Sequence, residues 1–183
     1  MEQGRSVTFP LALAQSDNAF LANAARKGDR PAFGLLYSRF ARMVHGILLA
    51  RVPRSEVDDL VQDVFLLALR RLDTLRDPCA FGPWLAMIAR NRATDYHRRS
   101  RETTELSEDC AAQDPRPAEA LAVLSTIQKL PEAYRETLVL RLVEGMSGPE
   151  IAERTGLTPA SVRVNLHRGM KLLREKLEGR EAS

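Results

Sequence analysis

Several features that would define a site or a location are scarce in this sequence. Its 183 residues include two cysteines and three histidines, and 5% of them are aromatic. Cys79 and Cys110 form no C-x-x-C pair, and the histidines are scattered, so neither a zinc site nor a disulfide framework is indicated. No apolar run approaches the roughly 20 residues that span a bilayer. We expect two reduced thiols, no metal, no cofactor and no membrane insertion.

The first residues contain one short apolar stretch. Residues 7–14 are apolar and end in a small-x-small pattern, as a signal peptide does. Pro10 splits this stretch, and Glu2 offsets Arg5 in front of it. We therefore interpret residues 1–18 as a flexible tail and expect a cytoplasmic protein.

What the sequence does contain is helical periodicity. Hydrophobic residues make up 44% of the chain, enough for a core. Apolar residues recur at three- and four-residue steps from Phe33 to Leu48, from Val57 to Leu72 and from Trp84 onwards. Sustained period-two patterns are missing. The pattern predicts an all-α fold, with Ser55 as the N-cap of the helix after Pro53.

The periodicity divides the chain into two small helical domains. It disappears over residues 103–117, where acidic residues and two prolines indicate an extended linker. We expect an N-terminal helical domain over residues 19–102 and a C-terminal helical domain over residues 118–179.

The C-terminal domain carries the signals of a helix-turn-helix. Ser147 and Glu150 fit a capping box at the start of a short helix, and Gly156 stands where that helix must end. Thr158 and Pro159 are then suited to the N-cap and first position of the next helix. Two helices joined by a short turn with a glycine form this motif.

In such a motif the second helix enters the major groove with its N-terminal part on the bases. Arginine and asparagine suit bidentate contacts with guanine and adenine edges. The alternative is a plain helical hairpin with a solvated basic face. The candidate residues for DNA binding are Thr158, Ser161, Arg163, Asn165, Arg168 and Lys171.

The third periodic segment ends in a run of arginines beside aromatic residues. Such a mixture suits single-stranded nucleic acid, where rings stack on bases and arginines follow the backbone. Trp84 taken alone is more typical of a core, and an arginine run can be a solvated helix end. The arginines are Arg90, Arg92, Arg98, Arg99 and Arg101, and the aromatic residues are Phe81, Trp84 and Tyr96.

Three segments in this order resemble the extracytoplasmic-function (ECF) sigma factors of bacterial RNA polymerase. The segment from Glu56 to Phe65, Glu-Val-Asp-Asp-Leu-Val-Gln-Asp-Val-Phe, resembles the family's Asp-Leu-Val-Gln-Glu-Val-Phe helix. Trp84 to Asn91, Trp-Leu-Ala-Met-Ile-Ala-Arg-Asn, resembles its Trp-Leu-x-x-Ile-Ala-Arg-Asn signature. Leu130 to Glu136, with the helix-turn-helix after it, resembles the family's second DNA-reading domain.

The resemblance implies three binding surfaces and no catalytic residue. The first would bind the clamp helices of the polymerase's largest subunit, through Asp58, Asp59, Gln62, Asp63 and Leu66. The second would open and read the minus-ten promoter element, through Asn91, Arg92, Asp95, Tyr96, Arg98, Arg99 and Arg101. The helix-turn-helix would read the minus-thirty-five element, next to the polymerase flap.

The resemblance also implies a pocket for a flipped promoter base, formed by residues 75–80 with Asn91. In the family the acidic linker threads the polymerase cleft, and a separate anti-sigma protein regulates the factor. This chain departs from the family where Arg163-Val164-Asn165 and Gly169-Met170 replace more basic residues. A promoter preference therefore cannot be carried over from the family.

Two other functions fit parts of the pattern. A stand-alone helix-turn-helix repressor or activator would need a dimer interface or an effector pocket, and the N-terminal domain shows neither clearly. A metal-dependent nuclease would use Asp58, Asp59 and Asp63, but these carboxylates lack further ligands and a nearby nucleophile or base.

Overall fold

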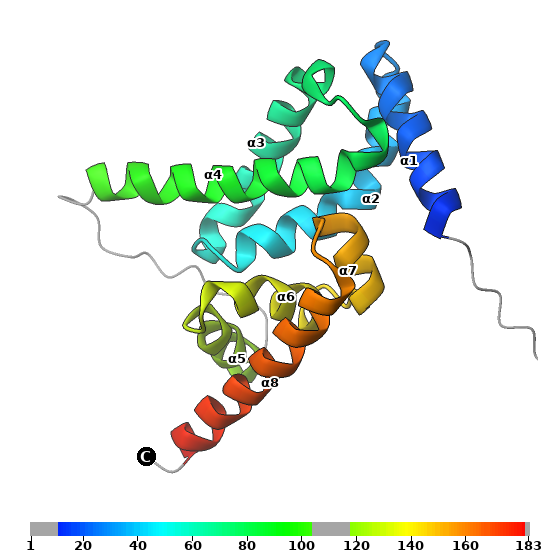
Figure 1. The fold of residues 1–183 in the computed structure, drawn as a ribbon. Coiled ribbons are helices and arrows are strands. Elements are labelled where there is room, and N and C mark those ends of the chain that lie inside the picture. Colours follow the sequence, from blue (N-terminus) through cyan, green and yellow to red (C-terminus); the bar gives the residue numbers. More distant parts are fainter. Residues whose placement is uncertain (1–10, 104–117, 182–183) are drawn as a thin grey trace, which may run out of the picture.

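The computed structural model describes residues 11–103 and 118–181, and these residues form helices joined by short turns (Figure 1). The α-helices are α1 (Leu11–Arg26), α2 (Arg30–Leu49), α3 (Val57–Arg70), α4 (Phe81–Thr103), α5 (Ala118–Gln128), α6 (Glu132–Leu142), α7 (Gly148–Thr155) and α8 (Pro159–Glu181). Three 3-10 turns cover Arg54–Glu56, Leu72–Thr74 and Pro78–Ala80. The described residues contain no strand, which confirms the all-α prediction.

Helices α1 to α4 form the N-terminal domain. Helix α2 is its centre, since it packs against α1, α3 and α4. The side chain of Asp29 caps α2 by accepting a hydrogen bond from the N–H of Ala32 at 3.0 Å. Leu36, Val44 and Ile47 lie one or two turns apart on α2 and are fully buried. The apolar stripe expected from the sequence therefore forms the core of this domain.

Helices α5 to α8 form the C-terminal domain. Helix α8 packs along α6, α7 and α5. Ile151, Val162 and Leu173 are buried where these helices meet. In Figure 1 this group lies against α2 and α4, so the two domains form one continuous body in the described part of the chain.

Three local predictions differ from the structure. Helix α1 begins at Leu11, so eight residues of the tail expected over residues 1–18 are helical. Ser55 does not cap α3, because it lies inside the 3-10 turn Arg54–Glu56 and its hydroxyl donates to the Glu56 carboxylate at 3.2 Å. Helix α4 continues to Thr103, one residue past the expected domain boundary. The rest of the expected linker, Cys110 and residues 1–10 lie outside the described residues.

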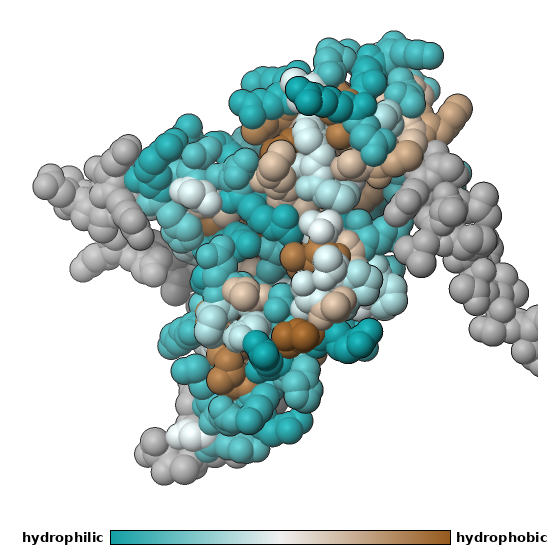
Figure 2. Space-filling model, in the orientation of Figure 1, coloured by the Kyte–Doolittle hydropathy of each residue, from teal (hydrophilic) through white to brown (hydrophobic). Residues whose placement is uncertain are grey.

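The surface is largely hydrophilic in the orientation of Figure 2, with hydrophobic side chains in small separate groups. Among the helices that the structure describes, none has the length and hydropathy that a membrane crossing requires. Cys79 is a free, exposed thiol.

Candidate nucleic-acid interface

The outer face of α3 carries the residues expected to bind a protein. Asp58, Asp59, Gln62 and Leu66 are exposed, and Leu66 retains 53% of its accessible surface. Their spacing places them on the side of α3 opposite its buried apolar stripe. Leu69 on the same face is 47% exposed. Two exposed leucines next to polar side chains agree with a protein-binding surface that has an apolar part and a polar rim.

The fifth expected residue of this surface, Asp63, has another partner. Its carboxylate forms an ion pair with the Arg92 guanidinium of α4. Sequence reasoning had placed Asp63 on a polymerase surface and Arg92 on a DNA surface. The structure brings the two together, so this pair links α3 to α4 at the border of both expected surfaces.

The remaining residues of the expected single-strand surface lie along α4 from Asn91 onwards. Asn91, Arg98 and Arg99 are exposed, while Asp95 and Tyr96 are half-buried. Arg98 forms an ion pair with Asp95, with 3.1 Å between guanidinium nitrogen and carboxylate oxygen. Arg101 belongs to the same helix, two residues before its end.

Asn91 lies in a groove between α3 and α4. The groove has a volume of about 470 Å³ and is lined by Leu67, Arg71, Ile88, Asn91, Arg92, Thr94 and Asp95. The loop of residues 75–80, which the resemblance had placed beside Asn91, is not among the lining residues. The groove offers arginine, amide and carboxylate groups beside two aliphatic side chains, which suits a polar planar group such as a base.

Trp84 packs mainly inward. Its ring is half-buried against the core, with its centroid 5.8 Å from that of Phe81. Phe81 is fully buried and lies 5.2 Å from the ring of Phe40. The interpretation of Trp84 as a core residue is therefore confirmed.

Arg90 also points inward, although its place in the arginine run suggested a phosphate contact. Its guanidinium donates two hydrogen bonds to the Glu136 carboxylate, at 3.1 and 2.7 Å, and one to the carbonyl of Thr155 at 3.3 Å. Both partners belong to the C-terminal domain. Sequence reasoning missed this contact because nothing near Arg90 in the chain indicates its partner.

The helix-turn-helix is formed as its sequence signals predict. The N–H of Ser147 donates to the Glu150 carboxylate at 2.8 Å, and the Glu150 N–H donates back to the Ser147 hydroxyl at 3.4 Å. Helix α7 then ends at Thr155, and its C-cap Gly156 has a φ of +77°, in the left-handed region. Hydrogen bonds from the backbone N–H and the hydroxyl of Ser147 hold the pKa of Glu150 below its ordinary value.

Helix α8 presents its basic residues to solvent. Arg163, Arg168 and Lys171 are exposed, whereas Asn165 is half-buried. The Thr158 hydroxyl accepts from the N–H of Ser161 at 3.1 Å and lies 2.8 Å from the Ser161 hydroxyl. Thr158 therefore caps α8, as its sequence position predicts, and holds the first turn in place.

In the described part of the chain, no three histidine, cysteine, aspartate or glutamate side chains are grouped as a metal ion would require. The three expected surfaces carry hydrogen-bonding and charged side chains.

Comparison with known proteins identifies the family. The family models of Sigma-70 region 2 and of Sigma-70, region 4 match residues 36–103 and 120–173. The chain is 36% identical over 161 residues to the RNA polymerase sigma factor CarQ of Myxococcus xanthus, covering 83% of this chain and 92% of that protein. It is 30% identical over 183 residues to the ECF RNA polymerase sigma-E factor of Escherichia coli K12, and the match covers 90% of this chain and 96% of that protein.

The chain belongs to the ECF sigma factors of bacterial RNA polymerase. This sigma factor directs promoter recognition at transcription initiation and is not an enzyme. Its fold is similar to that of CnrH in complex with the cytosolic domain of CnrY. That match has a TM-score of 0.63 and 32% identity, and it covers 89% of this chain and 98% of the other.

The match to region 2 runs from Leu36 in α2 to the end of α4, and the match to region 4 runs from Ala120 in α5 to Leu173 in α8. The three motifs that carried the sequence resemblance thus fall on α3, on α4 and on α6 to α8 of this sigma factor.

Proposed function

We propose that the outer face of α3 binds the clamp helices of the polymerase's largest subunit. The observation that supports this is the exposure of Asp58, Asp59, Gln62 and Leu66 on one helix face that packs against nothing else in the described chain. Polar residues beside the exposed Leu66 and Leu69 agree with a docking surface that has a small apolar part.

We further propose that α4 opens and reads the minus-ten element, with Asn91 and the groove beside it taking one unstacked base. Asn91, Arg92 and Asp95 line this groove. Arg98 and Arg99 follow on the same helix. Stacking and hydrogen bonds in a pocket offset the few kcal/mol that base extraction costs.

The first turns of α8 are proposed to read the minus-thirty-five element, with Arg163 and Asn165 facing base edges and Arg168 and Lys171 nearer the phosphates. Region 4 would lie next to the polymerase flap, and the acidic segment of residues 103–117 in the polymerase cleft.

An anti-sigma protein is the proposed regulator, and the cytoplasm the proposed location. The similarity to CnrH, which was solved in complex with the cytosolic domain of CnrY, supports the first. The cytoplasmic location is supported by the binding of sigma factors to RNA polymerase and promoter DNA.

The docking assignment is tested by a double substitution, Asp59→Ala with Gln62→Ala. We expect it to weaken binding to core polymerase by roughly 2 kcal/mol or more, because interface energy concentrates in few residues. The measurement is a fluorescence titration of labelled sigma factor with core polymerase. Asp73→Ala is the matched control, since Asp73 is an exposed acid of the same domain outside α3. Unchanged affinity of the double variant would remove α3 as the docking helix.

A further inference from the structure

A buried carboxylate joins the two domains. Glu136 of α6 retains 5% of its accessible surface. Its two oxygens accept hydrogen bonds from Arg51 at 2.7 Å, from Arg90 Nη2 at 2.7 Å and from Arg90 Nε at 3.1 Å. Both arginines belong to region 2, and Glu136 belongs to region 4. Removing one partner from such a buried ion pair is strongly destabilising, because the other charge is left buried and unpaired.

Further polar contacts surround this centre. The His45 ring lies 2.6 Å from the Glu144 carboxylate, and the Gln128 amide donates to the carbonyl of Leu49 at 2.8 Å. Arg154 donates to the carbonyl of Arg39 at 2.9 Å. Each of these hydrogen bonds joins region 2 to region 4.

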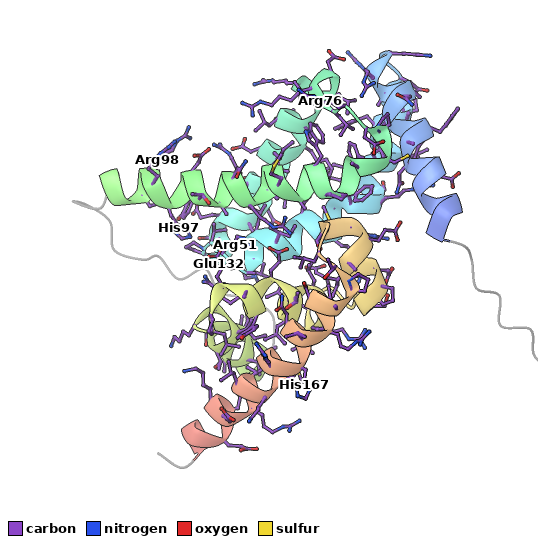
Figure 3. All side chains as sticks on the ribbon, in the orientation of Figure 1. Arg51, Arg76, His97, Arg98, Glu132 and His167 are labelled. Atoms are coloured by element: carbon purple, nitrogen blue, oxygen red, sulfur yellow. The ribbon has the colours of Figure 1, made fainter. Side chains whose placement is uncertain are left out.

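Arg51 and Glu132 continue the interface towards solvent. They form an ion pair at 2.7 Å, and Figure 3 shows them between α4 and α6, beside His97. Glu132 is 68% exposed and Glu136 is 6% exposed when the side chains alone are considered. The two carboxylates on α6 thus differ in burial while they share Arg51.

A glycine lets the helices approach closely. A Cβ at Gly46 of α2 would lie 2.7 Å from Leu140 Cδ2 and 2.9 Å from Glu144 Cγ. These separations are shorter than a van der Waals contact, so α6 occupies the space of the missing side chain. The interface is therefore matched in shape as well as in charge.

The closed arrangement cannot reach both promoter elements at once. The minus-ten and minus-thirty-five elements are about 25 base pairs apart, or about 85 Å at about 3.4 Å per base pair. A compact chain of this length has a radius of gyration of about 16 Å. Region 2 and region 4 must separate for α4 and α8 to occupy their elements together.

We propose that Glu136 is an interdomain latch, which through Arg51 and Arg90 holds the free sigma factor in a closed state unable to bridge the two elements. The claim that the domains must separate rests on the proposed function, in which α4 and α8 read different promoter elements. The claim that the free protein is closed does not rest on the proposed function. Polymerase binding would draw the domains apart and expose the latch residues to water.

The test is small-angle X-ray scattering of the full-length free protein. Glu136→Gln removes the charge that both arginines share, and we expect the closed-to-open equilibrium to shift by about 10- to 100-fold towards the open state. The radius of gyration should rise. Glu132→Gln is the matched control on the same helix, and it should scatter like the parent protein because Glu132 is largely solvated.

A second variant separates opening from damage to region 4. Gly46→Leu keeps every charge and favours the α2 helix, but its side chain occupies the space of Leu140 in the closed state. It should expand the protein as Glu136→Gln does, with unchanged helix content by circular dichroism. If both variants scatter like the parent protein, or if the parent protein is already expanded, the latch proposal is wrong.

Binding to core polymerase gives an independent readout. If core polymerase binds only open molecules, the apparent affinity of the sigma factor for core is reduced in proportion to the fraction that is open. Both variants should therefore bind core up to about 100-fold more tightly than the parent protein. Because scattering is measured without DNA or polymerase, it tests the latch even where the assignment of the reading helices fails. An expanded protein with unchanged core affinity would show that the contact exists but does not restrain function, which would overturn its role as a latch.

Discussion

At the scale of single residues, the partner of a charged side chain decides its role. Arg90, Arg92 and Arg98 lie within nine positions on α4 and look equivalent in the sequence. Arg90 binds Glu136, Arg92 binds Asp63, and Arg98 faces solvent beside Asp95. The Arg98 side chain is 68% exposed, compared with 30% for Arg90 and 22% for Arg92. The position of an arginine in a charge run therefore does not show whether its side chain faces solvent or a partner inside the protein.

The contribution of Arg163 can be separated from that of general positive charge. Arg163→Ala should weaken the free energy of promoter binding by about 1–3 kcal/mol. It should also relax the base preference at one position of the minus-thirty-five element, as the loss of a base contact does. Lys176→Ala, an exposed basic residue later on α8, should leave base preference unchanged. Binding of holoenzyme to a set of single-base promoter variants measures both. Equal base preference in Arg163→Ala and the parent protein would place Arg163 away from the bases.

At the scale of elements, the helix-turn-helix was predictable because its signals are local. The capping box, the glycine at the end of α7 and the Thr-Pro start of α8 each depend on residues within four positions of one another. The N-cap of α3 was predicted wrongly, because a 3-10 turn and an α-helix share the same first residues. The contacts of Glu136 could not be predicted, since its partners lie 85 and 46 residues away.

The capping box of α7 makes region 4 sensitive to acid. The folded state holds the pKa of Glu150 below its ordinary value of 4.5, first through the N–H of Ser147 and then through its hydroxyl, with Arg154 and Arg42 nearby. A lowered carboxyl pKa stabilises the fold above the unfolded value and loses that contribution as the pH falls towards the folded value. The stability that Glu150 provides is therefore complete near pH 7 and declines below about pH 4.5.

Thermal unfolding at pH 7 and near pH 4 checks this expectation. Glu150→Gln should be less stable than the parent protein at pH 7, by no more than about 1 kcal/mol because the site is partly exposed. The difference should narrow at the lower pH. Glu153→Gln is the control on the same helix outside the capping box. A difference that stays constant with pH would mean that the Glu150 charge does not stabilise the box.

At the scale of the whole molecule, one chain holds two DNA-reading domains and a contact between them. The surfaces on α3, on α4 and on the first turns of α8 all remain at the exterior while α6 and α7 pack against α2 and α4. The docked arrangement thus leaves the proposed binding residues accessible but fixes their separation. Composition and periodicity predicted both domains, whereas their packing depends on shape and charge between segments distant in the chain.

The most direct test of this account is transcription in vitro by core polymerase over a library of promoter sequences, with and without this protein. We predict that transcripts start only when the protein is added, from templates that share two sequence elements at a fixed spacing. Transcription that does not depend on the protein, together with tight binding of the protein alone to a palindromic duplex, would contradict the account and favour a stand-alone helix-turn-helix regulator.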